Sequence, residues 1–207
     1  MQVRSVVATG LMMAMLGAGL ALADEAAPRG PMQISPTAAR ADTGLHGKAF
    51  DAQEIVDAGH KFFGTTTRGL ARAVESVFRA HGRPTGYVLG EEASGAFVAG
   101  VRYGEGWLYM KNGERRKIFW QGPSIGIDAG GEGTKVLMLV YNLNTPRGIF
   151  GRWPGINGSA YLVAGFSISA YGDEELVMFP IRSGIGARLG ANIGYLKITE
   201  QPTWNPF

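Results

Sequence analysis

Apolar and polar positions alternate most clearly within residues 119–143, and the rest of the chain is organised around this stretch. Residues 123–129 alternate strictly, which predicts a strand with Ser124 and Asp128 on the same face. Residues 136–143 are almost continuously apolar, which predicts a strand covered on both faces. The glycine-rich segment between them favours a tight turn, so we expect the two strands to form a hairpin.

Helical spacing of apolar residues precedes this β-type pattern. Residues 51–63 predict a helix that begins with a capping box of Asp51 and Glu54 and ends at Gly64. A second helix is predicted over residues 68–80, with an N-cap from the threonines before it. Its apolar stripe comprises Leu70, Val74, Val77 and Phe78.

From residue 87 onward, short apolar runs alternate with turn residues, as is typical of antiparallel strands. The predicted strands are 87–89, 94–103, 107–111, 117–120, 123–129, 136–143, 159–171, 175–180 and 185–199. The predicted turns are 104–106, 112–113, 172–173 and 183–184, and a long connection with a short helical turn is predicted over 144–157. The pattern favours a small closed barrel or a sandwich. We predict a mainly β fold, in which a small antiparallel β-barrel follows two α-helices that cover one end or one face.

Residues 1–23 have the pattern of a cleaved secretory signal peptide. Arg4 precedes an uncharged apolar run, and small residues favour cleavage after Ala23. An uncleaved membrane anchor is the alternative, but the run is shorter than the ~20 apolar residues that a spanning helix needs. The next segment is rich in Ala, Pro, Gly and Arg, which predicts a disordered linker. The expected organisation is a signal peptide (1–23), a linker (24–48), a helical segment (49–83), a β-barrel (84–200) and a tail (201–207).

The composition narrows the class of protein. With 45% hydrophobic and 18% charged residues, the chain has enough apolar side chains for a packed core. Its net charge of +3 is too small to indicate a nucleic-acid-binding protein. The absence of cysteine excludes disulfides, a thiol nucleophile and a thiolate-bound metal.

The histidines and glycines carry no recognisable catalytic or binding motif. His46, His60 and His81 all precede the β region, so a Ser-His-Asp site would have to borrow one of them. No two of them have the spacing of zinc ligands. The glycine runs lack the Lys-Ser/Thr pair that opens the helix of a phosphate-binding loop. We therefore predict no metal, no cofactor and no catalytic residue.

Acidic side chains offer the remaining route to an enzyme. The acids that could supply the carboxylate pair of a glycosidase are Glu91, Glu105, Asp128 and Glu132. Nothing in the sequence selects a pair among them. Glu91 and Glu92 are adjacent, so their side chains point in opposite directions. The four tryptophans, Trp107, Trp120, Trp153 and Trp204, are expected to pack in the core or at its rim rather than to form a sugar-binding platform.

The predicted ligand-binding residues fall into two groups, one in the barrel and one on the second helix. They are Arg102, Ser124 and Asp128 in the barrel, and Arg68, Arg72 and Arg79 on the helix. Asp128 needs a partner such as Arg102 or Lys135 if it faces the interior, and it is solvated if it faces outward. The helical arginines form either a solvated face or a patch directed toward anionic lipid or glycan.

Four segments resemble the envelope integrity protein A (EipA-like) family over residues 50–198. They are FFGTTTRGLARAVESVF, GRPTGYVLGEEASGAFVAGVRYGEGWLYMK, WQGPSIGIDAGGEGTKVLMLVYNL and PGINGSAYLVAG. The resemblance implies a periplasmic protein of Gram-negative bacteria with a small β-barrel. It also implies a role in cell-envelope integrity, linked to surface polysaccharide and peptidoglycan homeostasis. No catalytic residues are established for the family, so none are transferred.

Three functions are weighed on these grounds. The first is a non-enzymatic periplasmic barrel that supports envelope integrity through envelope proteins or glycan, with no nucleic acid and at most peripheral membrane contact. The second is a lipid-binding module, because the helical start and small-residue strands are also loosely similar to the SYLF domain. The third is a hydrolase of envelope glycan that uses acids such as Glu91 or Asp128. An apolar cavity open at one barrel end would support the second function, and two converging acids with raised pKa would support the third.

Overall fold

The computed structural model describes residues 49–64, 67–96, 99–125, 133–156, 160–183 and 194–205. All of them belong to one compact unit of the chain, Gln33–Phe207. The helices are α1 (Ala52–Phe63), α2 (Arg68–His81) and the short 3-10 helix η2 (Pro146–Ile149). The strands are β1 (Gly86–Ala96), β2 (Ala99–Met110), β3 (Arg115–Ile125), β4 (Thr134–Tyr141), β5 (Gly151–Pro154), β6 (Tyr161–Val163), β7 (Phe166–Ile168), β8 (Tyr171–Gly172), β9 (Val177–Ser183) and β10 (Tyr195–Thr199).

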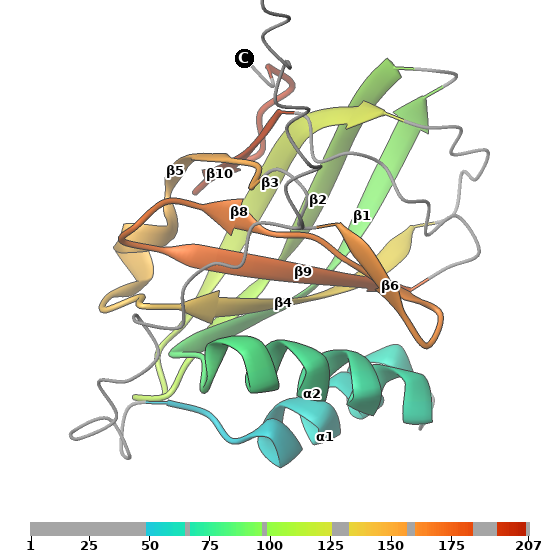
Figure 1. The fold of residues 1–207 in the computed structure, drawn as a ribbon. Coiled ribbons are helices and arrows are strands. Elements are labelled where there is room, and N and C mark those ends of the chain that lie inside the picture. The colour runs from blue at the N-terminus through green and yellow to red at the C-terminus, as the bar shows by residue number, and fades with distance from the viewer. Residues whose placement is uncertain are drawn as a thin grey trace, which may run out of the picture. The chain divides into compact units, whose positions relative to one another are not determined.

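The strands form one curled antiparallel sheet, which confirms the predicted mainly β fold with two preceding helices. Their order is β5-β10-β3-β2-β1-β4-β9-β7-β6, and β8 pairs with β9. The long strands β1, β2 and β3 cross one side of the molecule, and β4 and β9 cross the other (Figure 1). One isolated bridge, between Gly155 and Tyr171, joins the end of β5 to β8. The described sheet is therefore a half-barrel whose two sides meet through a single bridge.

Both helices begin and end where the sequence predicts, within one residue. The reciprocal capping box of Asp51 and Glu54 starts α1, and Gly64, with a φ of 74°, ends it. The hydroxyl of Thr67 accepts a hydrogen bond from the Leu70 amide and caps α2. Lys135 on β4 donates to the carbonyl oxygens of Phe62 and Phe63 at 3.0 and 3.4 Å, respectively, and so ties the end of α1 to the sheet.

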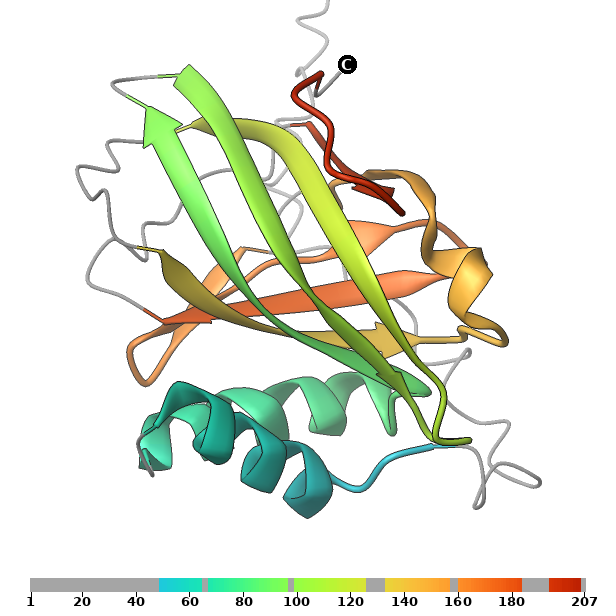
Figure 2. The ribbon, with the colours of Figure 1, turned by 180° about the vertical axis from the view of Figure 1, so that it is seen from behind.

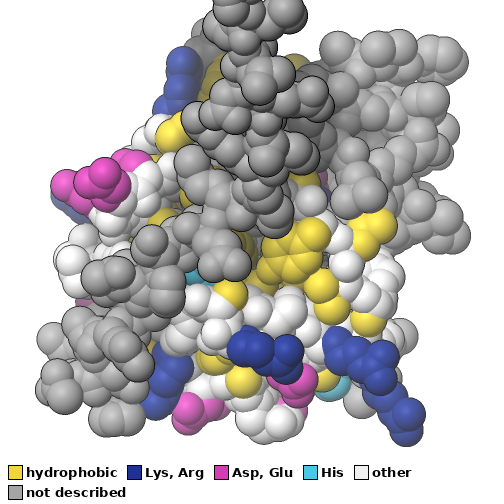
Figure 3. Space-filling view, viewed as in Figure 1, with side chains coloured by type: hydrophobic (Ala, Val, Ile, Leu, Met, Phe, Trp, Pro, Cys, Tyr) yellow, Lys and Arg dark blue, Asp and Glu magenta, His cyan; other side chains and the backbone are white. Residues whose placement is uncertain are grey.

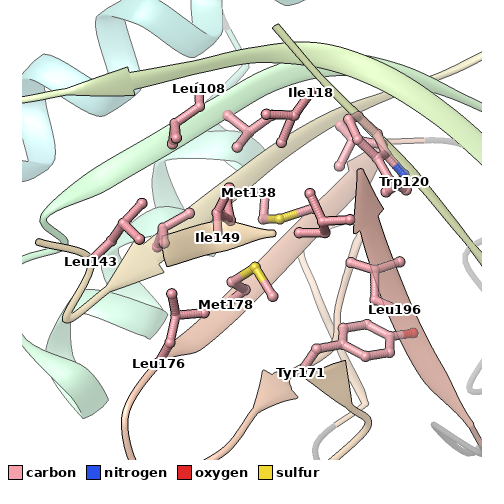
Figure 4. Close-up of a cluster of buried hydrophobic side chains, with 14 of the residues drawn as sticks. Leu108, Ile118, Trp120, Met138, Leu143, Ile149, Tyr171, Leu176, Met178 and Leu196 are labelled. Atoms are coloured by element: carbon pink, nitrogen blue, oxygen red, sulfur yellow. The ribbon is translucent and has the colours of Figure 1, made fainter. Parts of the chain in front are cut away.

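Two apolar clusters share the strand β4, whose burial on both faces is confirmed. Val136 and Met138 belong to the cluster inside the half-barrel, where side chains from β1, β2, β3, β9 and β10 meet (Figure 4). Leu137 and Leu139 belong to the outer cluster, where α1 and α2 cover β4, β7 and β9 (Figure 2). Alternate residues of one strand thus serve two different layers. Side chains fill this part of the interior.

The predicted hairpin between residues 123–129 and 136–143 is wrong. β3 pairs with β2 and β10, whereas β4 pairs with β1 and β9, so the two strands are not neighbours. The physical reason lies in burial. A strand that is apolar on both faces must lie where both faces are covered, and that place is between β1 and β9, beneath the helices. Residues 126–132, which include the predicted turn, lie outside the described residues.

The predicted turn at residues 104–106 is also wrong, because both of its glycines lie inside β2. A Cβ atom at Gly104 would come within 2.1 Å of the Trp120 indole, and one at Gly106 within 2.4 Å of the Leu89 carbonyl oxygen. These glycines therefore make room for a buried tryptophan and a neighbouring strand. The residues predicted as one strand, 94–103, divide between β1 and β2, and the predicted short strand 87–89 is part of β1.

The remaining segments match their predictions in part. The Asn112-Gly113 hairpin is confirmed by the pairing of β2 with β3 and by the φ of 89° at Gly113. The helical turn within 144–157 is confirmed as η2, which β5 follows. Residues 159–171, predicted as one strand, contain the hairpin β6–β7 and the start of β8, because Ala164 and Gly165 adopt positive φ values.

Candidate functional site

A buried carboxylate, Glu92 of β1, lies at the centre of the polar residues inside the half-barrel. Its side chain is 6% exposed. The guanidinium of Arg182, from β9, donates to both carboxylate oxygens, through Nε at 3.0 Å and Nη2 at 3.3 Å. The indole Nε1 of Trp120, from β3, donates to Oε2 at 2.8 Å. Three strands that are far apart in the sequence thus converge on one carboxylate.

Two further side chains complete this interior ion cluster. Arg102 of β2 lies 4.0 Å from Glu92 and donates to the Pro123 carbonyl oxygen at 3.2 Å. Arg182 also donates to the Ser169 hydroxyl at 2.8 Å. The cluster therefore holds two guanidinium groups around one carboxylate, and it anchors β1, β2, β3 and β9 to one another.

The charge state of Glu92 follows from this environment. Burial alone would raise the pKa of Glu92, but the positive charges of Arg182 and Arg102 and the hydrogen bonds from Arg182 and Trp120 together hold it below its usual value. The carboxylate is therefore ionised near neutral pH, with both oxygens occupied. That state suits a structural ion pair and does not suit a proton donor.

The outer face of the same strands carries a groove with a volume of about 350 Å³. Glu91 and Glu105 are direct partners across β1 and β2, and both line the groove. Tyr103 and Gln121 are direct partners across β2 and β3, and they line it too. With Phe119 and Trp204, these residues define what we call the outer groove, and Glu92, Gly104 and Trp120 of the same strands also line it. It combines aromatic rings with carboxylates and one amide.

Gln121 is the unusual member of the outer groove. Only 1% of the residue is exposed, yet its Nε2 atom has no hydrogen-bond partner in the structure. An unpaired buried donor costs free energy, and such groups are rare in native proteins. Gln121 lines the outer groove, but its Nε2 atom is itself buried and is not exposed to the hollow.

The residues after β10 form one wall of the outer groove. Tyr103 donates from its hydroxyl to the Trp204 carbonyl oxygen at 2.8 Å, and the two rings lie 5.4 Å apart. Lys197 of β10 donates to the Asn205 carbonyl oxygen at 3.1 Å. Tyr103 and Lys197 are the strand neighbours of Gln121 on either side. The C-terminal segment is therefore held on both sides of Gln121, and Figure 2 shows its red trace beside β3.

The predicted ligand-binding residues do not form one site. Arg102 belongs to the interior ion cluster, and Ser124 pairs with Gly100 through the backbone at the end of β3. Asp128 lies outside the described residues. The residues predicted on the second helix, Arg68, Arg72 and Arg79, are exposed on one stripe of α2.

The helical arginines do not form a continuous patch of positive charge. Glu75 lies within the same stripe, because it follows Arg72 by three residues and precedes Arg79 by four. Figure 3 shows basic and acidic side chains next to one another over the helical layer. A solvated face explains this arrangement.

The candidate acids and histidines are placed as follows. Glu91 and Glu105 are both exposed, and Glu105 pairs with Lys117 at 3.2 Å.

The described histidines have structural contacts. His60 contacts the Thr67 carbonyl oxygen at 3.2 Å. The ring centres of His81 and Phe179 lie 4.3 Å apart, and burial lowers the pKa of His81. Within the described ranges, no three His, Asp or Glu side chains gather as metal ligands would. Asp128, Glu132 and His46 lie outside those ranges.

Three residues of these two sites were given no role from the sequence. Glu92 was overlooked because residues 90–93 were not assigned to a strand, although alternation places Glu92 on the opposite face from Glu91. Gln121 and Phe119 carry no motif, and only the strand register brings them beside Tyr103 and Glu105. Trp204, predicted to pack in the core or at its rim, is 85% exposed and packs against Tyr103 beside the outer groove.

The fold and the two sites define a β-barrel-like protein with an apolar cluster and an ion cluster inside the described sheet, a helical layer and a groove on the outer side of the strands. The family model of Envelope integrity protein A matches residues 48–207, so the chain belongs to this family and the resemblance seen in the sequence is confirmed. A crystal structure of a β-barrel-like, uncharacterised protein from Brucella abortus is 55% identical, with a TM-score of 0.70. The similarity covers 77% of this chain and 99% of that chain. No curated protein matches the chain.

Membership in this family suggests an envelope location and a role in envelope integrity. Among the helices that the structure describes, none is both long enough and apolar enough to cross a bilayer.

Proposed function

We propose that this protein is exported to the periplasm, cleaved after Ala23, and supports cell-envelope integrity as a non-enzymatic binding protein that acts through its outer surface. Family membership supports the envelope role. The observation that carries the rest is the packing of the described part of the interior. Apolar side chains from seven strands meet there, and the polar positions are joined by hydrogen bonds and ion pairs around Glu92.

The packing of side chains in the described part of the interior favours binding at the surface. A lipid-binding barrel needs an apolar cavity with an open mouth. Here Leu108, Met138 and Met178 are fully buried within one apolar cluster (Figure 4). Trp120 of the same cluster donates to Glu92 of the ion cluster. The mixed charges of α2 give anionic lipid no continuous basic surface. Both features weigh against a lipid carrier of the SYLF type.

The carboxylates give no support to a hydrolase. Among the described carboxylates, Glu54 and Glu92 both have a lowered pKa, whereas a general acid needs a raised pKa. For Glu54 the leading causes are hydrogen bonds from the Asp51 amide and Lys111. Glu105 is neutralised by Lys117. We therefore propose a role in surface polysaccharide and peptidoglycan homeostasis that depends on binding.

The experiment is a deletion of the gene followed by complementation. The full chain with its signal segment is expected to restore resistance to detergent and to cell-wall antibiotics, and the periplasmic form is expected to begin at Asp24. A chain without residues 1–23 is the matched control and is expected to restore nothing. A deletion strain as resistant as its parent would contradict the envelope role.

Native mass spectrometry of the periplasmic form separates the two binding functions. The expected mass is that of the polypeptide from Asp24 onward, without lipid. A bound mass in the phospholipid range would overturn the proposed surface-binding mode in favour of a lipid carrier.

A further inference from the structure

We infer that the outer groove binds the quaternary ammonium group of a small soluble ligand, with the rings of Trp204, Tyr103 and Phe119 around its methyl groups. The Glu91 carboxylate balances its charge, and the buried amide of Gln121 takes no part. This inference rests on the proposed function and names the ligand class of its surface. The volume of about 350 Å³ falls within the range of small-molecule sites.

The groups that would hold the ligand are open to solvent. Trp204 is 85% exposed, and the rings of Tyr103 and Phe119 are partly exposed on the outer face of β2 and β3. Glu91 and Glu105 are both exposed. A ligand can therefore reach the rings and the carboxylates without a change in the fold.

The aromatic rings favour a cation. The face of an aromatic ring attracts a cation that lies within about 6 Å of the ring centre. The protein itself shows this preference, because the Lys117 ammonium lies 5.2 Å from the Phe119 ring centre and 3.2 Å from Glu105. Among the described residues, no Lys or Arg lies over the ring of Trp204 or of Tyr103. The centres of these two rings lie 5.4 Å apart and their planes meet at 61°, so they offer a ligand two inclined aromatic walls.

The charge of the outer groove sets the sign of the ligand. Glu91 and Glu105 are direct partners across β1 and β2, and like charges in this position repel each other. Lys117 balances Glu105, whereas Glu91 forms no ion pair with any described residue. Glu92 also lines the groove, but its carboxylate is bound to Arg182. No Lys or Arg lines the groove among the described residues, so its rim attracts a cation and repels an anion.

The apolar share of the lining favours a methylated ammonium group over a primary one. A primary ammonium is compact and strongly hydrated, and it brings three N–H donors that need acceptors. A quaternary ammonium has no N–H donor, and its methyl groups contact aromatic rings while the charge is retained. The source is a soluble molecule, because the carboxylates at the rim would be repelled by an anionic bilayer surface.

A titration of the mature protein from Asp24 with choline tests the inference, with the indole signals followed by nuclear magnetic resonance. We expect the Trp204 signal to shift and to saturate at millimolar choline. The neutral analogue, in which a tert-butyl group replaces the trimethylammonium group, is expected to bind about tenfold more weakly because it lacks the charge. Ethanolamine, which lacks the methyl groups, is also expected to bind more weakly. An unmoved Trp204 signal, or equal binding of choline and its neutral analogue, would overturn the inference.

Two tryptophan variants locate the site. Trp204→Ala is expected to weaken choline binding about tenfold, as followed by the Tyr103 amide signal. Because Trp204 is 85% exposed, this variant is expected to fold normally. Trp107→Ala is the matched control, because Trp107 lies on the outer face of β2, is 40% exposed and does not line the groove. Unchanged choline binding by Trp204→Ala would overturn the site.

Two charge variants are expected to act in opposite directions. Glu91→Gln removes the carboxylate that balances the ligand and is expected to weaken choline binding about two- to fivefold, the range of an exposed ion pair. Lys117→Met removes the cation that competes for Glu105 and Phe119, so it is expected to strengthen binding by a similar factor. Weaker binding by Lys117→Met, or stronger binding by Glu91→Gln, would overturn the cationic ligand.

The outcomes distinguish this inference from the proposed function. If choline does not bind while the full chain restores a deletion strain, the inference fails and the proposed function stands. If choline binds but the deletion strain is as resistant as its parent, the proposed function fails and the site stands. If Trp204→Ala loses choline binding yet restores the deletion strain, the link between the two is overturned. Sedimentation of the protein with choline-phospholipid vesicles, reversed by free choline, would overturn the soluble source.

Discussion

Trp120 and Gln121 are adjacent residues of β3, and both are buried, but they face opposite sides of the sheet. The Trp120 donor bonds to Glu92 at 2.8 Å inside the half-barrel. The Gln121 donor, on the outer face, has no partner. The interior therefore satisfies its polar groups, as a structural core does, whereas the outer groove leaves one unsatisfied. The inner face therefore contributes more to the stability of the fold than the outer face does.

The largest effect on stability is expected from Glu92. The Glu92→Gln variant leaves Arg182 and Arg102 buried without a counter-charge, which is expected to lower the free energy of unfolding by about 3–5 kcal/mol. Chemical denaturation measures the change. Glu91→Gln, the neighbour in the outer groove, is the matched control and is expected to stay within about 0.5 kcal/mol of the wild type. Equal effects of the two variants would contradict the division between the faces.

A smaller loss is expected from Gly104→Ala. The added methyl group would meet the Trp120 indole at 2.1 Å, and overpacking of this kind costs about 1–3 kcal/mol. Thermal denaturation of a double-mutant cycle with Trp120→Phe provides the control, because the smaller ring relieves the clash. Strict additivity of the two substitutions would show that Gly104 does not make room for Trp120.

Low pH is expected to lower the free energy of unfolding by weakening the ion pairs of Glu92. The pKa of Glu92 in the folded protein lies below its usual value of 4.5, so the unfolded chain binds more protons below that pH. The stabilisation from Glu92 is therefore complete above about pH 4.5 and is lost as the pH falls through the lower, folded-state pKa. Melting curves of the wild type and Glu92→Gln should converge as the pH decreases. A constant gap down to about pH 2 would contradict the lowered pKa.

The smallest effect on stability is expected from Gln121→Leu. Replacing an unpaired buried donor by an apolar group is expected to change the free energy of unfolding by about 1 kcal/mol or less, with an increase as the expected sign. Chemical denaturation beside Glu92→Gln gives the comparison directly. A loss as large as that of Glu92→Gln would show that Gln121 belongs to the structural core.

Local patterns in the sequence predicted the parts of the fold that depend on neighbouring residues. The caps at Asp51 and Thr67, the hairpin at Asn112-Gly113 and the two-sided burial of β4 all follow from residues within a few positions of one another. Strand pairing was not predictable in the same way. Gly104 resembles a turn residue until Trp120 is known to lie against it, and that contact depends on the register of β2 and β3.

The candidate sites were less predictable than the fold, because each is assembled from distant strands. Arg102 was predicted as one possible partner of Asp128, which lies outside the described residues, and in the structure Arg102 lies 4.0 Å from Glu92. Arg182 of β9 donates to the Glu92 carboxylate, although the two residues are ninety positions apart in the chain. Gln121 carries no sequence signal at all, since its significance lies in a missing partner.

Nuclear magnetic resonance tests the division between the two faces most directly. Hydrogen exchange would be followed at the indole Nε1 groups of Trp120 and Trp204 in the mature protein. We predict slow exchange at Trp120, whose indole donates to the buried Glu92 carboxylate, and fast exchange at Trp204, which is 85% exposed. Exchange at Trp120 as fast as at Trp204 would contradict the account.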